Sequence, residues 1–169
     1  MLIGKKVNQT LNEQIGYEFS ASLQYVAIAA YFEGEGLTEL ADLFHQQSTE
    51  ERDHAMRFVK YVIDAGGKLV IPAIPAPRPD FKDACDAISL SLKSEQHVTS
   101  QINELVNLAI SEGDHITQNM LTWFVAEQLE EVSSMETLLR VAERAGDNLL
   151  YVEEYVARHK AALLGKGAD

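Results

Sequence analysis

Hydrophobic residues recur at alternating spacings of four and three along four long stretches of the chain, the pattern typical of helices in a bundle. Glycine pairs and single glycines separate these stretches, and a shorter amphipathic stretch follows the fourth. No alternation typical of β-strands competes with this pattern. The sequence therefore predicts an all-α protein, a four-helix bundle with a short fifth C-terminal helix, in a single domain covering residues 1–169. The predicted helices cover about residues 5–34, 38–66, 82–112, 115–145 and 148–162.

All four prolines lie in one segment, KLVIPAIPAPRPD, between the second and third predicted helices. About 15 residues of extended chain at ~3.1 Å per residue reach about 45 Å. The second helix, with about 28 residues at ~1.5 Å each, is about 42 Å long. This match predicts that the segment crosses the whole bundle, joining two antiparallel hairpins so that helices two and three are parallel. An ordinary long surface loop is the alternative.

Polar residues interrupt every long hydrophobic series near the middle of its helix, and four helices packed side by side would bring them to one level. Burying the resulting layer of carboxylates costs several kcal/mol per group, and the carboxylates repel one another. No lysine or arginine occupies the four series. Two metal ions bridged by carboxylates satisfy this layer, and oxygen donors with one imidazole favour iron or manganese over zinc. The six residues are Glu18, Glu51, His54, Glu95, Gln128 and Glu131.

Each of these residues taken alone has a less specific interpretation. A Glu-x-x-His pair such as Glu51 and His54 is commonly solvated on a helix surface, and Glu18 could be exposed. Gln128 could pair with backbone, and Tyr25, in the same series as Glu18, would more often be a core residue than a redox partner. The metal-site hypothesis depends on all four helices placing ligand-type residues in phase.

The charge and cysteine content limit the partners. A formal net charge of −12 argues against binding to a nucleic-acid backbone, which needs a clustered basic surface, and suits a protein that attracts cations. A soluble acidic protein without such a role is the alternative. A single cysteine, Cys85, forms no internal disulfide and favours a reducing compartment. Without a signal-like N-terminus or a membrane-length apolar run, we expect a soluble cytoplasmic protein that makes no membrane contact.

Four motifs, in order, resemble those of the ferritin family, and within it the non-haem bacterial ferritins: LNEQIGYEFSASLQY, EERDHAMRF, KSEQHVTSQINEL and WFVAEQLEEV. The resemblance covers nearly the whole chain, and di-iron proteins of this kind generally combine Glu and Glu-x-x-His on the helices of a bundle. It implies a hollow homo-oligomeric cage of 24 subunits that stores ferric oxide. It also implies ferroxidase activity, in which dioxygen or hydrogen peroxide oxidises iron from Fe(II) to Fe(III).

The resemblance also implies roles for individual residues. One iron ion would be held by Glu18, Glu51 and His54, with Glu51 bridging to a second ion. The second ion would be held by Glu95 with help from Gln128 and Glu131. Tyr25 matches a tyrosine beside the centre that could supply one electron. A third, weaker iron position matches Glu50, Glu127, Glu130 and Glu131, although the spacing of Glu50 and Glu127 by itself indicates solvated helix residues.

Two departures separate the chain from the haem-binding bacterioferritins. The fourth helix of those proteins carries a second Glu-x-x-His, where this chain has Gln128 and Glu131. Their haem-ligating methionine, two residues before the histidine, is Arg52 here, and Met56 lies on the other side of His54. Haem binding is therefore not expected.

Three other classes of bundle protein compete with a storage protein. Rubrerythrin-type peroxidases need a cysteine-rich iron module, and an oxygenase needs a substrate pocket that large core residues would fill: Phe44, Phe58, Ile102 and Phe124. DNA-protecting mini-ferritins place their ligands between subunits and usually add a basic tail, whereas this C-terminus, KAALLGKGAD, is short and mixed. A purely structural or signalling bundle would have to bury the polar layer without metal.

Overall fold

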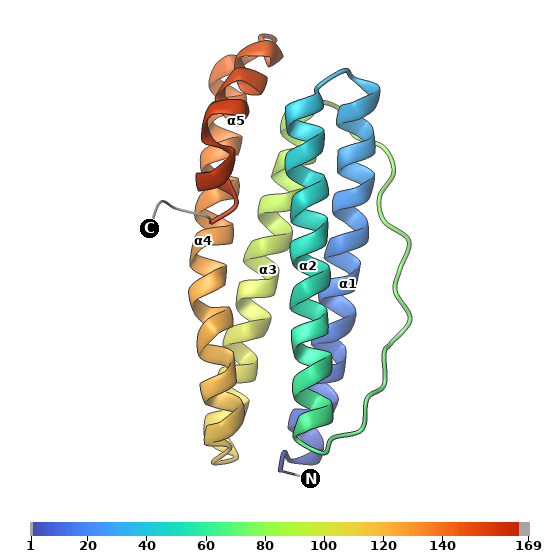
Figure 1. Ribbon diagram of the computed structural model, residues 1–169, viewed down its shortest axis with the longest axis vertical. Coiled ribbons are helices and arrows are strands. Elements are labelled where there is room, and N and C mark those ends of the chain that lie inside the picture. The colour runs from blue at the N-terminus through green and yellow to red at the C-terminus, as the bar shows by residue number, and fades with distance from the viewer. Residues whose placement is uncertain (1, 166–169) are drawn as a thin grey trace.

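The computed structural model describes residues 2–165, and these residues form five helices and no strand. The helices are α1 (Lys5–Gly34), α2 (Thr38–Asp64), α3 (Ala84–Ser111), α4 (His115–Ala145) and α5 (Leu149–Leu163). Figure 1 shows α1–α4 side by side as a bundle, with α5 folded back along α4. The predicted all-α fold with a short fifth helix is confirmed. Within the described residues, no helix has both the length and the apolar composition needed to cross a membrane. The last four residues of the mixed C-terminal stretch, 166–169, lie outside the described part.

The proline-rich segment between α2 and α3 runs along α1 for the length of the bundle, so that α2 and α3 are parallel (Figure 1). Amide side chains of α1 hold its backbone. Asn8 accepts from the backbone N–H of Lys68 at 2.9 Å and donates to its carbonyl at 3.1 Å. Gln24 makes the same pair of bonds with Arg78, at 2.8 and 3.0 Å. The predicted crossover is confirmed, and side chains of α1 satisfy backbone groups that extended chain cannot satisfy internally.

Close contact between α1 and this crossover depends on one glycine. A Cβ on Gly16 would lie 2.3 Å from Cγ of Pro72, whereas a Cβ on Gly34, in the same helix, would meet nothing within 4 Å. We expect Gly16→Ala to destabilise the fold by about 1–2 kcal/mol, because overpacking outweighs the gain in helix propensity. Gly34→Ala should be neutral or stabilising by up to about 1 kcal/mol. Thermal unfolding of the two variants checks this, and shifts of the same sign would contradict it.

The hydrophobic core consists of two clusters with a polar layer between them. The cluster near the α1–α2 turn contains Phe32 and Phe44, and the other contains Phe58 and Phe124. Phe58 of α2 and Phe124 of α4 stack with ring centroids 4.0 Å apart. Along α2, Glu51 lies halfway between Phe44 and Phe58. The core is therefore interrupted at mid-height, where the hydrophobic series of each helix is interrupted in the sequence.

Helix α5 docks on the bundle of the same chain. Val152 and Val156 are fully buried in the first core cluster. Glu153 accepts a hydrogen bond from the backbone N–H of Leu40 at 3.0 Å, in the first turn of α2. Leu37 is the N-cap of α2 and makes no side-chain hydrogen bond, and Thr38 is the first helical residue. A carboxylate from α5 instead satisfies one of the free N–H groups of α2, where the helix dipole favours negative charge.

Candidate metal centre

The six polar residues predicted at mid-height come together in one buried layer. Their exposed fractions lie between 1% and 5%, and each of the four long helices contributes at least one of them. The layer consists of Glu18 from α1, Glu51 and His54 from α2, Glu95 from α3, and Gln128 and Glu131 from α4. Neither Glu18 nor the Glu51–His54 pair is solvated, so the simple surface interpretation does not describe these residues.

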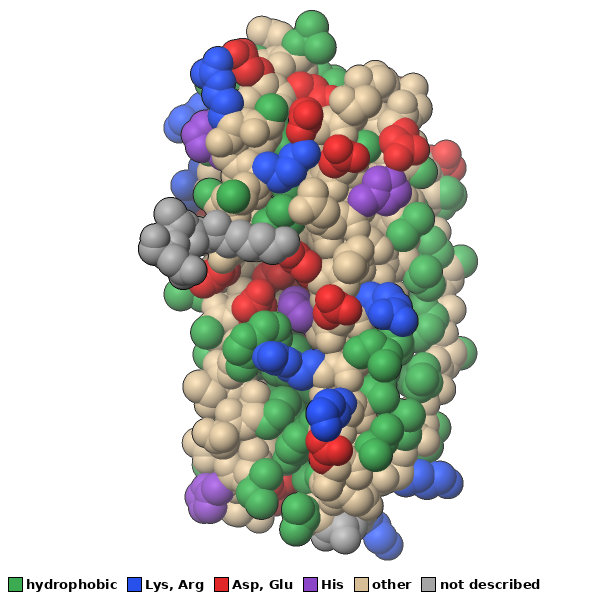
Figure 2. Space-filling view, in the orientation of Figure 1, with side chains coloured by type: hydrophobic (Ala, Val, Ile, Leu, Met, Phe, Trp, Pro, Cys, Tyr) green, Lys and Arg blue, Asp and Glu red, His purple; other side chains and the backbone are tan. Residues whose placement is uncertain are grey.

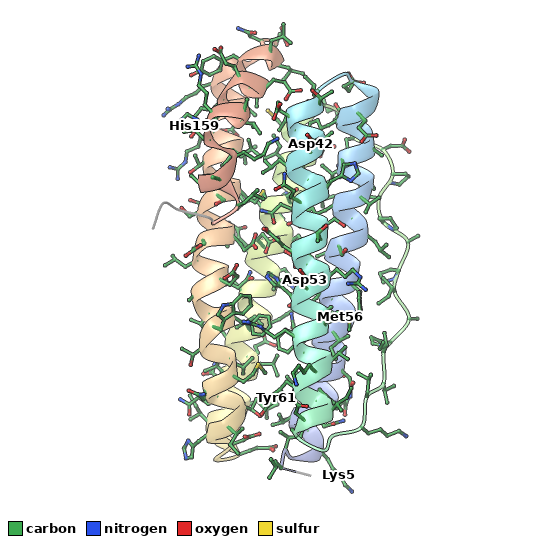
Figure 3. All side chains as sticks on the ribbon, viewed as in Figure 1. Lys5, Asp42, Asp53, Met56, Tyr61 and His159 are labelled. Atoms are coloured by element: carbon green, nitrogen blue, oxygen red, sulfur yellow. The ribbon has the colours of Figure 1, made fainter. Side chains whose placement is uncertain are left out.

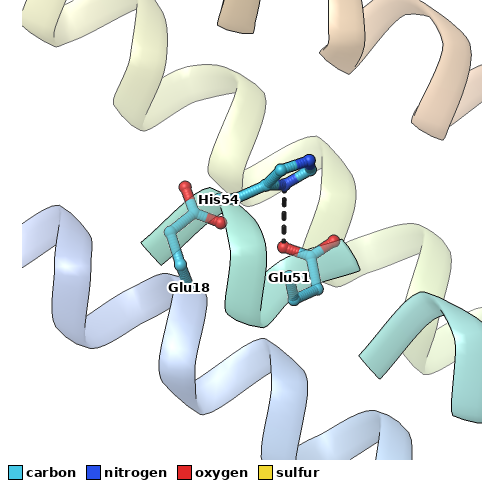
Figure 4. A group of neighbouring side chains, drawn as sticks. All are labelled: Glu18, Glu51 and His54. Carbon is cyan, nitrogen blue, oxygen red and sulfur yellow. Dashed lines mark ion pairs between the residues drawn. The ribbon is translucent and has the colours of Figure 1, made fainter. Parts of the chain in front are cut away.

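Two groups of three ligand-type residues share one member. Atoms of Glu18, Glu51 and His54 lie within 4.8 Å of one another (Figure 4), and so do carboxylate oxygens of Glu51, Glu95 and Glu131. Glu51 belongs to both groups and comes from the middle of α2. Two cations bound in these groups would be neighbours joined by the Glu51 carboxylate, which has two oxygens to offer.

Three of these carboxylates have an oxygen without a hydrogen-bond partner in the described part of the chain. They are Glu18 Oε2, Glu51 Oε1 and Glu131 Oε2, all buried from solvent. A buried acceptor left unsatisfied costs about 1–3 kcal/mol, and more when it is charged. Unpartnered oxygens on three helices, meeting in one layer, fit a ligand that supplies positive charge. The donor set fits hard cations with a preference for oxygen and a single imidazole.

Neighbouring side chains orient the remaining oxygens. Gln14 donates from Nε2 to Glu18 Oε1 at 2.8 Å, and the Tyr25 hydroxyl donates to Glu95 Oε1. Tyr25 is fully buried and its ring lies 5.7 Å from that of Phe44, so it is both a core residue and a neighbour of the centre. The sequence prediction missed Gln14. Its signal was its position one helical turn before Glu18, where the two side chains can meet.

Gln128 acts as a donor in this structure. Its Nε2 lies 3.2 Å from the backbone carbonyl of Glu95, from Glu95 Oε2 and from Thr99 Oγ1. The amide therefore orients Glu95 with its nitrogen, and a half-turn about its last torsion would present the oxygen in its place. Direct coordination of a metal by Gln128 stays a prediction.

Burial shifts the protonation of the whole layer. It raises the pKa of Glu18 to about 7, and burial followed by repulsion between carboxylates raises the pKa values of Glu51 and Glu131 well above their usual range. Burial, with a smaller effect of Arg57, lowers the pKa of His54 to about 4. Although His54 Nδ1 lies 3.4 Å from Glu51 Oε2, the imidazole is neutral at neutral pH, and the contact is not a strong ion pair. A neutral imidazole is ready to bind metal, and cation binding would release protons from the carboxyl groups.

A third group of ligand-type residues lies beside the first two. Atoms of His54, Glu127 and Glu131 lie within 4.8 Å of one another, and Glu127 is half-buried. The pKa of Glu127 is raised first by burial and then by Glu130 and Glu50, so these acids lie near it. Figure 2 shows acidic side chains gathered at mid-height on this face. Of the residues predicted for a third iron position, Glu127 and Glu131 thus meet in ligand geometry, with His54 in place of Glu50 and Glu130.

Comparison with known proteins decides the family. The family model "Ferritin-like domain" matches residues 8–145, which include every predicted ligand. The chain belongs to the ferritin family. This ferritin is 44% identical over 164 residues to Ferritin BfrB of Mycolicibacterium smegmatis, covering 97% of this chain and 89% of the relative. It is 36% identical over 155 residues to the bacterial non-heme ferritin of Staphylococcus aureus, covering 90% and 93%.

Solved structures agree with this assignment. The open pore ferritin of Archaeoglobus fulgidus superposes on this ferritin with a TM-score of 0.89 at 31% identity, covering 92% of this chain and 97% of that chain. The predicted resemblance to ferritins, and with it membership of a family of iron-storage cage proteins, is confirmed.

The position of a haem-ligating methionine is occupied by an exposed arginine in this ferritin. Arg52 lies on the outer surface of α2. Met56 is 42% exposed, and Figure 3 labels it together with Asp53 on the same helix. His54, two residues from both Arg52 and Met56, faces the interior side of α2 and is buried. Neither Arg52 nor Met56 takes part in the polar layer.

Proposed function

We propose that this ferritin oxidises Fe(II) to Fe(III) at the two groups of ligands that share Glu51, and deposits the product as ferric oxide inside a cage of 24 subunits. The observation that carries the proposal is the shared carboxylate, flanked by buried oxygens without partners. Iron is the substrate of this site and passes through it. Carboxylates with one imidazole suit iron in both oxidation states.

Each residue has a role that follows from its position. Glu18 and His54 hold the first ion, Glu95 and Glu131 hold the second, and Glu51 bridges them. Gln14 and Tyr25 keep Glu18 and Glu95 in place through their hydrogen bonds. Anionic oxygen ligands stabilise Fe(III) relative to Fe(II), because their attraction grows with the charge of the ion, and the loss of an electron becomes easier.

The electrons and protons balance with either oxidant. Two Fe(II) ions give up one electron each, and dioxygen takes both electrons with two protons to become hydrogen peroxide. With hydrogen peroxide as oxidant, two electrons and two protons give two molecules of water. Tyr25, whose hydroxyl donates to Glu95, is placed to supply one electron and its proton to the oxidant in place of the electron from one Fe(II). Burial, and then the neighbouring carboxylates, raise the pKa of Tyr25, so it holds its proton until it is oxidised.

The packing around the centre favours storage over the competing functions. Phe124 lies 5.9 Å from the His54 ring and stacks on Phe58, so aromatic side chains occupy the space an organic substrate would need. The ligands come from four helices of one chain, whereas mini-ferritins build their sites between subunits. A purely structural bundle gives no account of the unpartnered carboxylate oxygens.

Titration of the metal-free protein with Fe(II) in aerobic buffer tests the proposal. We expect fast oxidation up to two Fe(II) per subunit, followed by a slower phase. Glu136→Gln, which alters an exposed pair with Arg140 on α4, should leave this break point unchanged. Sedimentation should give the mass of 24 subunits of 18.8 kDa. Oxidation no faster than in buffer, or a monomer in solution, would contradict the proposal.

A further inference from the structure

Two serines join α1 to α2 by hydrogen bonds that cross between the helices. The hydroxyl of Ser22 donates to the backbone carbonyl of Ser48 at 2.7 Å, and the hydroxyl of Ser48 donates to the backbone carbonyl of Ser22 at 2.8 Å. Both side chains are buried, and their hydroxyl oxygens lie 3.1 Å apart. Another side-chain contact between α1 and α2, that of His45 with Glu33, lies at the exposed surface. The two serines therefore form a reciprocal pair inside the protein.

A reciprocal pair of this kind fixes how the two helices lie against each other. Each carbonyl belongs to a helix and accepts an N–H of that helix, and its second lone pair accepts the hydroxyl of the other helix. Because a serine side chain is short, it reaches the opposite backbone only where the two helices are close. A shift of either helix along its axis, or a larger separation, would weaken both bonds together. The pair therefore sets both the separation and the relative height of α1 and α2.

The pair lies one helical turn from two of the predicted metal ligands. Ser22 follows Glu18 by four residues on α1, and Ser48 precedes Glu51 by three residues on α2. Residues three or four apart lie on the same face of a helix. Since α1 and α2 are antiparallel (Figure 1), both steps lead in the same direction along the bundle, to the first ligand group of Glu18, Glu51 and His54. The separation that the serines fix is thus the separation across which this group would bind a cation.

A serine on α3 has a similar position without a bond between helices. Ser91 precedes Glu95 by four residues and is fully buried. Its hydroxyl donates to the backbone carbonyl of Ala87, in the same helix, at 3.2 Å. This bond stays within α3 and does not constrain a second helix. Ser91 therefore provides a matched control for the pair on α1 and α2.

We infer that Ser22 and Ser48 are positioning residues that set the affinity of the first ligand group for its cation. The inference rests on the proposed ferroxidase function, in which this group takes up Fe(II). The hydroxyls act through the distance between Glu18 and Glu51 and coordinate no ion themselves. When the pair is lost, α1 and α2 adopt a wider range of separations. A cation must then draw the two carboxylates into place, and binding becomes weaker because the site is no longer preorganised.

The double variant Ser22→Ala/Ser48→Ala tests the inference, with Ser91→Ala as the control. Initial rates of Fe(II) oxidation are measured over a range of Fe(II) concentrations. We expect the half-saturating concentration to rise at least about tenfold in the double variant. The maximal rate should stay within about threefold, because high Fe(II) overcomes weak binding. Loss of folded protein would instead lower the maximal rate and leave half-saturation unchanged, and that result would overturn the inference.

Anaerobic titration with Co(II), followed by visible absorption, measures the affinity of the centre without any oxidation. The affinity for at least one of the two Co(II) ions should fall at least about tenfold in the double variant, and Ser91→Ala should match the unaltered protein. If the double variant does not fold, Ser22→Ala and Ser48→Ala are measured separately. Each loses one of the two crossing bonds and should weaken Co(II) binding by about threefold or more.

The outcomes separate this inference from the ferroxidase proposal. Co(II) affinities and half-saturating Fe(II) concentrations within about twofold of the unaltered protein would overturn the inference, and so would equal changes in Ser91→Ala. An unaltered protein that oxidises Fe(II) no faster than buffer would refute the ferroxidase proposal. The Co(II) affinities would then decide by themselves whether the two serines position the first ligand group.

Discussion

Replacing Glu51 with glutamine is expected to slow the initial oxidation of Fe(II) by at least about 100-fold while the subunit stays folded. Glu51 is the residue common to both ligand groups, so the substitution affects both ions at once. Glutamine preserves the shape of the side chain, but its neutral amide offers one oxygen and cannot bridge two cations. Loss of this charge also removes part of the preference for Fe(III) that drives oxidation.

Stopped-flow absorbance at low iron loading measures this effect, and Glu136→Gln provides the same chemical change on the exposed surface of α4. Because Glu51 is buried with a raised pKa, its neutral replacement should not lower the stability of the metal-free protein. The melting temperature is measured in parallel, because it separates loss of the bridging ligand from loss of the folded state. An initial rate within about threefold of the unaltered protein would rule out a bridging role.

Replacing Glu18 with glutamine is expected to stabilise the metal-free protein at high pH and to leave it unchanged at low pH. The pKa of Glu18 is about 7 in the folded state, above the usual value near 4.5, because burial disfavours the charged form. Below about pH 4.5 the group is protonated in both the folded and unfolded states. Between about pH 4.5 and 7 the folded state binds more protons, so stability falls as the pH rises, and above 7 the loss is complete. Glutamine cannot ionise, and the variant avoids a loss of up to about 3 kcal/mol.

Denaturation in the presence of a chelator, compared at about pH 5 and about pH 8, measures this difference. The gap between Glu18→Gln and the unaltered protein should widen with pH. Saturating Co(II) should reverse the order at high pH, because the ionised Glu18 binds the cation and metal binding to the folded state stabilises it. Curves for Glu18→Gln and the unaltered protein that stay parallel without metal would contradict the raised pKa.

Much of the centre was predictable because the helix period is local. The positions of Glu18, Glu51, Glu95 and Glu131 within their hydrophobic series fix the face on which each side chain lies, before any partner helix is known. The length of the proline-rich segment likewise limited the topology, since only a crossover uses its full reach. Burying these carboxylates without basic partners has a high energetic cost, and that cost by itself led to the metal hypothesis.

Other features depend on contacts between helices that periodicity does not specify. The hydrogen bond from Tyr25 to Glu95 joins α1 to α3. The oxygen of Gln47 is buried without a partner in the described part of the chain, at a place where the end of α5 meets α2 and α4. The start of α2 has no local side-chain cap, and the distant Glu153 accepts a hydrogen bond from its first turn. Such contacts are set by the angles and heights at which helices meet, which follow from packing of whole surfaces.

By itself, the sequence determined that four helices would place acidic side chains and one histidine in their shared interior, since the spacing of residues along a helix dictates the direction of each side chain. Only the tertiary structure decided which oxygens face one another, which of them lack a donor, and how strongly each holds its proton. Those properties depend on distances of a few ångströms between different helices and on exclusion of water, and both arise only when the bundle closes.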